Sequence, residues 1–175
     1  MGRRDLVQAC GSHPLMRALR PGKLALTALE ATLRIYMDGA DVAHRDIPVL
    51  SMLTLPQAHL ERRARKLRDR MVAGLDKAGC PCAVQVEIVE ESSTPGGGSL
   101  PTVELPTMCV GVRLVDARLT VDALKRSLIQ DFDTPVVTRA SHDRLLFDVR
   151  TLVGDRDIET AASTLVACVE KAIAR

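Results

Sequence analysis

Aromatic residues are scarce in this sequence, which has two Phe, one Tyr and no Trp among 175 residues. The hydrophobic core must therefore be aliphatic, and stacking of bases on aromatic rings is excluded as a way of binding nucleic acid. An excess of charge is also missing, because the formal net charge is only +2 and favours no class of partner. No apolar run is long enough to span a membrane, and the N-terminus has no apolar signal region. We therefore expect a cytoplasmic protein.

Motifs for metal binding and for familiar catalytic machinery are absent as well. The five cysteines are scattered, and only Cys80 and Cys82 lie close together, which leaves too few ligands for a zinc site. No nucleophile has a His at a familiar spacing, and neither an HExxH motif nor a paired-carboxylate pattern occurs. We predict free thiols and no metal.

Hydrophobic periodicity predicts an α+β chain in two parts. Helical spacing of apolar residues is found at 3–10, 15–19, 23–37, 56–78, 120–132 and 156–174. Alternating apolar residues predict strands at 83–89, 108–115, 135–139 and 144–149, the last two joined by a turn at 141–143. We predict a helical part, residues 1–47, and a compact α+β domain, residues 48–175, with an antiparallel sheet and helices mainly on one face.

Three further segments complete this prediction. Residues 41–54 are expected to be a mixed connector, and residues 91–106, dense in Gly, Pro and Ser, a long loop. The long helix at 23–37 has apolar residues on most sides, which predicts that it is buried on most sides.

Three cations, Arg17, Arg20 and Lys23, lie just before and inside the first turn of that long helix. The helix dipole disfavours positive charge there, but free N–H groups and two guanidinium forks could converge on one tetrahedral anion. The alternative is three solvated cations, whose clash with the dipole costs only roughly 0.3–1 kcal/mol each. Spacing alone leaves both interpretations open.

Other candidate features are less specific. Gly97, Gly98 and Ser99 lie in the long loop, where glycines permit close backbone approach to a ligand or simply a flexible connection. The basic residues between 62 and 70 could follow RNA phosphates, although an ordinary solvated helix face is favoured. Arg150 follows a strand with one charged side, and it could hold a substrate carboxylate or belong to a half-exposed strand with cross-strand ion pairs.

Four blocks of the sequence resemble a known family. They are SHPLMRALRPGKLALTALEATLRIYMDG, IPVLSMLT, GGGSLPTVELP and DRLLFDVRTL, in the family's order and with its spacing. The chain is similar to the C-terminal portion of bacterial selenocysteine synthase, L-seryl-tRNA(Sec) selenium transferase, a pyridoxal phosphate enzyme of fold type I. The resemblance implies a helical remnant of the cofactor domain, a long linking helix and then the small C-terminal domain.

The resemblance also implies a reaction and its partners. Family enzymes convert seryl-tRNA(Sec) to selenocysteinyl-tRNA(Sec), with selenophosphate as donor and pyridoxal phosphate as electron sink. Arg17 and Arg20 match the two arginines that are thought to bind the anionic donor, while Met16 replaces a frequent Lys of that block. Gly97, Gly98, Ser99 and Arg150 are expected on the active-site side, and the protein is expected to be a homo-oligomer.

The lysine that forms the Schiff base with the cofactor is expected upstream of this chain. Asp76-Lys77 mimics the family's Asp-Lys pair, but Ala-Gly-Cys-Pro follows it in place of the family's Leu- and Gly-rich run. We therefore expect no catalytic residue here, no activity of the chain alone, and a truncated or mis-started gene product. The alternatives are a related pyridoxal phosphate lyase or transferase acting on a small phosphorylated substrate, and a non-enzymatic domain that dimerises through exposed helices.

Overall fold

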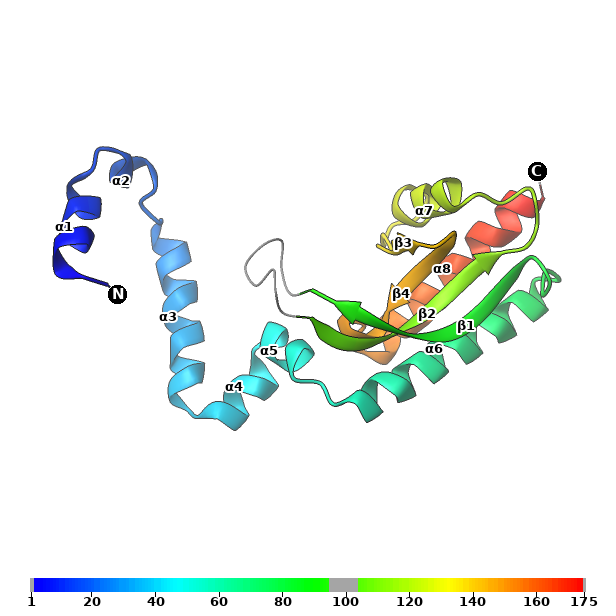
Figure 1. Cartoon of the computed structure of the whole chain (residues 1–175), viewed down its shortest axis with the longest axis horizontal. Helices are drawn as coiled ribbons and strands as arrows, with labels where there is room; N and C mark the ends of the chain where they lie inside the picture. Colours follow the sequence, from blue (N-terminus) through cyan, green and yellow to red (C-terminus); the bar gives the residue numbers. More distant parts are fainter. Residues whose placement is uncertain (1, 95–103, 175) are drawn as a thin grey trace. The chain divides into compact units, whose positions relative to one another are not determined.

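The computed structural model describes residues 2–94 and 104–174 (Figure 1). Its helices are α1 (Arg4–Ser12), α2 (Leu15–Ala18), α3 (Lys23–Met37), α4 (Ala40–Asp46), α5 (Pro48–Leu53), α6 (Gln57–Lys77), α7 (Val121–Gln130) and α8 (Asp155–Ile173). Its strands are β1 (Val84–Ser93), β2 (Leu105–Leu114), β3 (Arg139–Ser141) and β4 (Arg144–Asp148), and a 3-10 turn, η1 (Val149–Thr151), follows β4. The chain divides into two compact units, Met1–Ser51 and Met52–Arg175. Among the described helices, none has both the length and the hydropathy needed to cross a membrane.

The second unit is an α+β sandwich of one sheet and its helices, as predicted. The sheet is antiparallel throughout, in the order β1-β2-β4-β3. Strands β1 and β2 pair from Val84 opposite Leu114 to Ser93 opposite Leu105, and β4 joins β2 with Phe147 opposite Val110. Helices α6 and α8 lie side by side against one face of this sheet (Figure 1).

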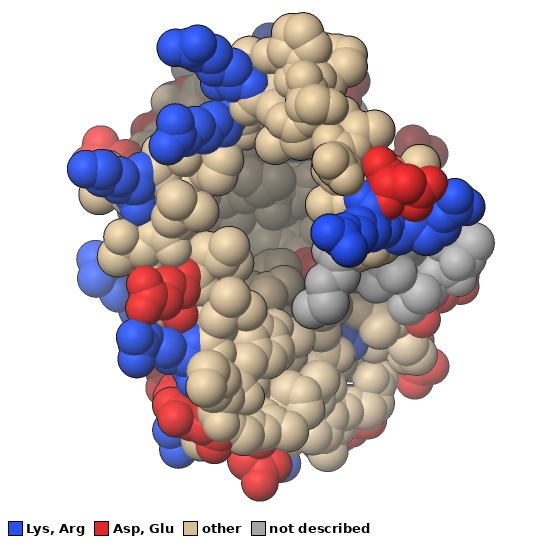
Figure 2. All heavy atoms as spheres, turned by 90° about the vertical axis from the view of Figure 1, so that its left-hand side faces the viewer, with Lys and Arg blue, Asp and Glu red and all other residues tan. Residues whose placement is uncertain are grey.

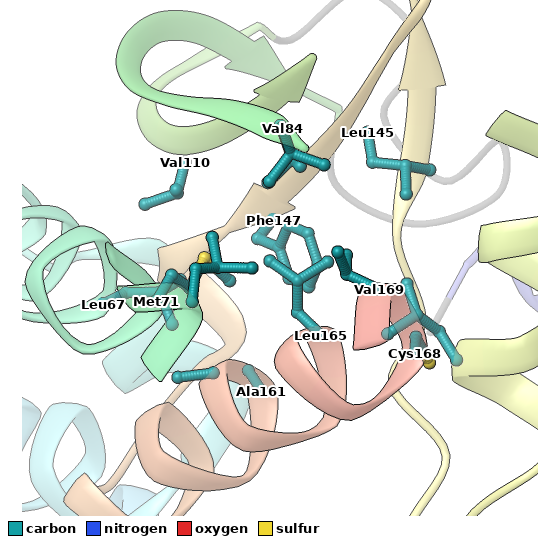
Figure 3. Packing of buried hydrophobic residues seen from close by; sticks show 14 of the residues in the cluster. Leu67, Met71, Val84, Val110, Leu145, Phe147, Ala161, Leu165, Cys168 and Val169 are labelled. Atoms are coloured by element: carbon teal, nitrogen blue, oxygen red, sulfur yellow. The ribbon is translucent and has the colours of Figure 1, made fainter. Parts of the chain in front are cut away.

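The core between the sheet and these helices is aliphatic, apart from one phenylalanine (Figure 3). Leu67 and Met71 of α6 and Leu165 of α8 point toward Phe147 of β4, and all four side chains are buried. The stripe predicted for α6 is confirmed, because its members recur at helical spacing and are all buried. They are Leu60, Ala64, Leu67, Met71 and Leu75.

A close approach of α6 and α8 depends on a glycine. A Cβ atom at Gly74 would lie 2.7 Å from Cγ2 of Val166 in α8. We expect Gly74→Ala to lower the free energy of unfolding by about 1 kcal/mol, because overpacking outweighs the gain in helix propensity. In urea denaturation, Val166→Ala should make the same glycine substitution neutral or stabilising. Equal losses in both backgrounds would contradict the close approach.

The opposite face of the sheet is covered by its own arginine side chains. Cys109 is on this face, because its neighbour Val110 points into the core and side chains alternate along a strand. Arg139 reaches across it, donating from Nη2 to Cys109 Sγ at 3.5 Å and from Nη1 to the carbonyl oxygen of Ser92 at 3.1 Å. Cys109 is therefore fully buried on a face opposite the helices.

This burial makes a prediction about thiol reactivity. Burial, together with the charge of Asp148, raises the pKa of Cys109 to about 11, so its reactive thiolate forms only in strong alkali. We expect a thiol reagent near neutral pH to modify exposed Cys10 and Cys82 rapidly and Cys109 only on unfolding.

Removal of the arginine above Cys109 is the direct test. Arg139→Ala should make Cys109 reactive in the folded protein, as measured by mass spectrometry of labelled peptides. Arg113→Ala, which removes an arginine from the same face, should leave it protected. Rapid labelling of Cys109 in the unsubstituted protein would contradict the burial.

Several element predictions were wrong. The segment predicted as a connector, 41–54, is mostly helical and forms α4 and α5. Pro48 does not prevent this, because it occupies the first turn of α5, where its missing N–H costs nothing. The segment 91–106, predicted to be a loop, is partly paired. Strand β1 continues to Ser93, and β2 begins at Leu105, directly opposite it. Residues 135–138 are outside the sheet, and β3 is Arg139–Ser141.

The turn after β3 is where it was predicted. His142 and Asp143 both have positive φ, 48° and 59°, as in the two-residue turns that match the twist of a hairpin. The predicted cap of α7 is also confirmed, since Thr120 Oγ1 accepts from the N–H of Ala123.

The first unit is helical, but it has almost no core. The prediction that α3 is buried on most sides was wrong for the described chain, because none of its residues is buried. Among the described residues of this unit, only Ala43 and Ile47 are buried, since its apolar stripes have no second layer of the unit to pack against. Large apolar side chains exposed on α2 and α3 are Leu15, Met16, Leu24, Leu26, Leu29, Leu33, Tyr36 and Met37.

Candidate anion-binding site

Arg17 and Arg20 are on either side of the end of α2. Helix α2 is a single turn, and the N–H of Leu15 at its start donates to Nδ1 of His13 at 3.2 Å. Arg17 is in its last turn, and Arg20 is in the short link to α3. Helix α3 begins at Lys23 after Gly22, and no side chain caps its first N–H groups. One short stretch thus brings together two arginines and a free helix N-terminus.

The charges in this stretch are uncompensated. Some other arginines of the first unit have carboxylate partners close in sequence, such as Arg3 with Asp5 at 2.7 Å and Arg34 with Glu30 at 2.8 Å. Within the described residues, the side chains of Arg17 and Arg20 make neither a hydrogen bond nor an ion pair, and no Asp or Glu occurs between residues 6 and 29. Figure 2 shows Lys and Arg side chains in several separate groups, some with Asp or Glu beside them and some without. Both guanidinium groups are therefore available to an anion.

Arg150 has a structural place in the second unit. Its guanidinium group is buried, and it donates to the carbonyl oxygens of Met52 at 2.8 Å, of Leu53 at 3.4 Å and of Pro106. These bonds tie the segment before α6 to the start of β2. The other residues predicted beside it, Gly97, Gly98 and Ser99, lie outside the described residues.

From Arg65 to Arg70 the basic residues of α6 are paired, which favours a solvated helix face over an RNA track in that part of the helix. Arg65 pairs with Glu61 at 3.4 Å, and Arg68 pairs with Asp69 at 2.6 Å. Lys66 and Arg70 bridge to α8, where their partners are Asp155 at 2.7 Å and Glu159 at 2.9 Å. Arg62 is the basic residue of this face without a partner in the described part of the chain.

The lysines present do not fit covalent attachment of pyridoxal phosphate. Lys66 and Lys171 are held in ion pairs at 2.7 Å, with Asp155 and Asp131. Lys77 is at the exposed C-terminal end of α6, and Lys23 and Lys125 are in no enclosed cavity. For metals, the described residues contain no group of three or more His, Cys, Asp or Glu that could hold an ion. In the described part of the chain, Arg17 and Arg20 are therefore candidate anion ligands, and the lysines do not fit the cofactor.

The described chain is thus a helical segment with two unpaired arginines, followed by a small α+β unit. The comparison with known proteins gives the family: the sequence matches "L-seryl-tRNA selenium transferase" over residues 1–153. The chain belongs to this family.

Individual relatives agree with this assignment. The chain is 40% identical over 175 residues to the L-seryl-tRNA(Sec) selenium transferase of Moorella thermoacetica, covering 99% of the chain and 35% of that protein. It is 36% identical over 167 residues to the enzyme of Aquifex aeolicus, covering 94% of the chain and 33% of that protein. It is 41% identical over 152 residues to that of Nitratidesulfovibrio vulgaris, covering 87% and 30%. The chain thus spans about a third of the length of the curated relatives it matches.

Proposed function

We propose that this chain supplies the C-terminal region of a selenocysteine synthase, which converts seryl-tRNA(Sec) to selenocysteinyl-tRNA(Sec) with selenophosphate as donor. The exposed, unpaired arginines Arg17 and Arg20 are the observation that carries the proposal. Their role is to bind and orient the anionic selenium donor, because a guanidinium fork gives two parallel hydrogen bonds to a tetrahedral oxyanion.

The cofactor chemistry lies outside what these residues provide. Pyridoxal phosphate supplies an electron sink to such enzymes, and its covalent lysine must come from the part of the family's length that this chain does not span. The isolated chain is accordingly inactive in selenium transfer. Incubation with pyridoxal phosphate and reduction by borohydride should give no stoichiometric adduct at a single lysine.

A chimera tests the proposed function. The Moorella thermoacetica enzyme aligns with the chain over 175 residues, so its matching region can be replaced by this chain. The chimera should form selenocysteinyl-tRNA(Sec) from seryl-tRNA(Sec) and labelled selenophosphate. A chimera that folds and binds its cofactor but transfers no selenium would overturn the proposal.

Substitution of the arginine pair within that chimera tests the anion site. We expect Arg17→Ala and Arg20→Ala each to raise KM for selenophosphate by about tenfold or more, since a hydrogen-bonded ionic contact contributes about 1.5–3 kcal/mol. Arg4→Ala is the matched control, because Arg4 is also an exposed arginine without a partner in the described chain. An unchanged KM in both variants would remove these arginines from donor binding.

A further inference from the structure

A small, open basic cavity of about 200 Å³ lies between the first turns of α6 and α8. Its α6 wall consists of His59, Arg62, Arg63 and Lys66. These positions are i, i+3, i+4 and i+7, so their side chains lie on one face of the helix. Residues 153–155 and Ile158 form the wall at the start of α8. The two helix starts lie side by side in the second unit (Figure 1).

The positive charge in this cavity is only partly compensated. Lys66 is paired with Asp155 at 2.7 Å. Arg63 donates one hydrogen bond, from Nη2 to the carbonyl oxygen of Val153 at 3.3 Å, which fixes the guanidinium group without neutralising it. The side chains of His59 and Arg62 have no partner within the described residues. Two full positive charges and an imidazole therefore face an open cavity.

The N–H groups of the two residues that precede α8 are already occupied. The N–H groups of Val153 and Gly154 both donate to Oδ2 of Asp157, at 3.0 and 3.1 Å. The basic side chains available to an anion in the cavity all come from α6. The carboxylates of Asp155 and Asp157 at the same helix start disfavour a second negative charge on that anion.

This part of α6 differs from the rest of the helix. Beyond Lys66, the arginines have carboxylate partners, as in Arg68 with Asp69 and Arg70 with Glu159. Uncompensated charge is thus concentrated in the first two turns, next to the cavity.

We propose that His59, Arg62 and Arg63 form a binding site for a phosphate group with a single negative charge, the phosphodiester of an RNA backbone. The planar guanidinium groups of arginine match phosphate oxygens in geometry. The cavity opens beside exposed Arg62, so an RNA strand bound there can extend over the protein surface. This proposal is independent of the proposed selenium transfer, because RNA binding can be measured with the purified chain alone.

The test is the affinity of the purified 175-residue chain for a fluorescently labelled RNA hairpin, measured by anisotropy over a range of salt concentrations. The double variant Arg62→Gln, Arg63→Gln should weaken RNA binding by about tenfold or more. The dependence of log affinity on log salt concentration should also become shallower, by the amount expected for the loss of about two phosphate contacts. Arg65→Gln with Arg68→Gln is the matched control, because it removes two arginine charges of the same helix that are already paired. The control should change the affinity by less than about twofold.

A second arm distinguishes the source of the phosphate. Competition by inorganic phosphate, with amide NMR shifts confined to residues 59–66 and 153–155, would support the site and identify a free anion as its ligand. Binding of RNA without such competition would support the backbone as ligand. Equal losses in the two double variants, or no binding of either probe at low salt, would overturn the proposal.

Discussion

Replacing Arg150 with Met is expected to lower the free energy of unfolding of the second unit by about 3 kcal/mol or more. The buried guanidinium group donates to carbonyl oxygens from two separate segments, Met52 and Leu53 before α6, and Pro106 in β2. Methionine fills a similar volume but has no hydrogen-bond donor. The three carbonyl oxygens would therefore lose their partner while remaining partly shielded from water. A domain of this size has only about 5–15 kcal/mol of stability, so the effect is a large fraction of the total.

Two other substitutions make this result specific. Arg150→Lys keeps the charge but not the fork, and it should recover only part of the loss. Arg156→Met removes an exposed arginine from the first turn of α8, and it should change stability by less than about 0.5 kcal/mol. Urea denaturation followed by circular dichroism measures all three variants. Similar losses for the Arg150 and Arg156 variants would show that the buried hydrogen bonds are not the cause.

Hydrogen exchange provides an independent readout of the same contacts. The N–H of Arg150 donates to Oδ1 of Asp148 at 3.0 Å, and Asp148 also accepts from Ser93 and from Thr107 at 2.8 Å. Loss of the Arg150 guanidinium should therefore speed exchange in residues 52–56 more than around Asp148, whose partners remain.

The sequence predicted the parts of the fold that depend on regular periodicity. The stripe of α6, the pairing segments of β1 and β2 and the start of α7 follow from spacing and capping, which are local properties. Short elements were missed, because the three-residue strand β3 and the helix α5 carry too few periods to be distinguished from connectors. The strand β3 is fixed by its pairing with β4, and the end of α5 accepts hydrogen bonds from Arg150, about a hundred residues away.

The candidate sites divide in the same way. Arg17 and Arg20 could be found from the sequence, because an acid-free stretch before a helix is a local pattern. The place of Arg150 could not, since its partner Met52 is 98 residues away and its acceptors are backbone carbonyls that no motif identifies. The cavity at His59, Arg62 and Arg63 had a signal in the helical spacing of the basic residues, but its second wall comes from the start of α8.

Leu67→Ala is expected to lower the free energy of unfolding by about 3 kcal/mol, within the range of about 2–5 kcal/mol for buried leucines. Leu67 is fully buried where α6 faces the sheet, and the rigid β2–β4 pair behind it limits collapse of the cavity (Figure 3). The lost side chain removes both its transfer free energy and its packing contacts.

Leu24→Ala is the matched control, because it makes the same chemical change on another long helix, where the leucine is 89% exposed. It should change the stability of the chain by less than about 0.5 kcal/mol, as for other surface positions. Urea denaturation should also show an unchanged m-value for both variants, since neither alters the surface exposed on unfolding by much. A loss for Leu24→Ala as large as that for Leu67→Ala would mean that α3 packs against a partner in solution. The difference between the two leucines thus tests whether α3, unlike α6, contributes no buried contacts to the stability of the chain.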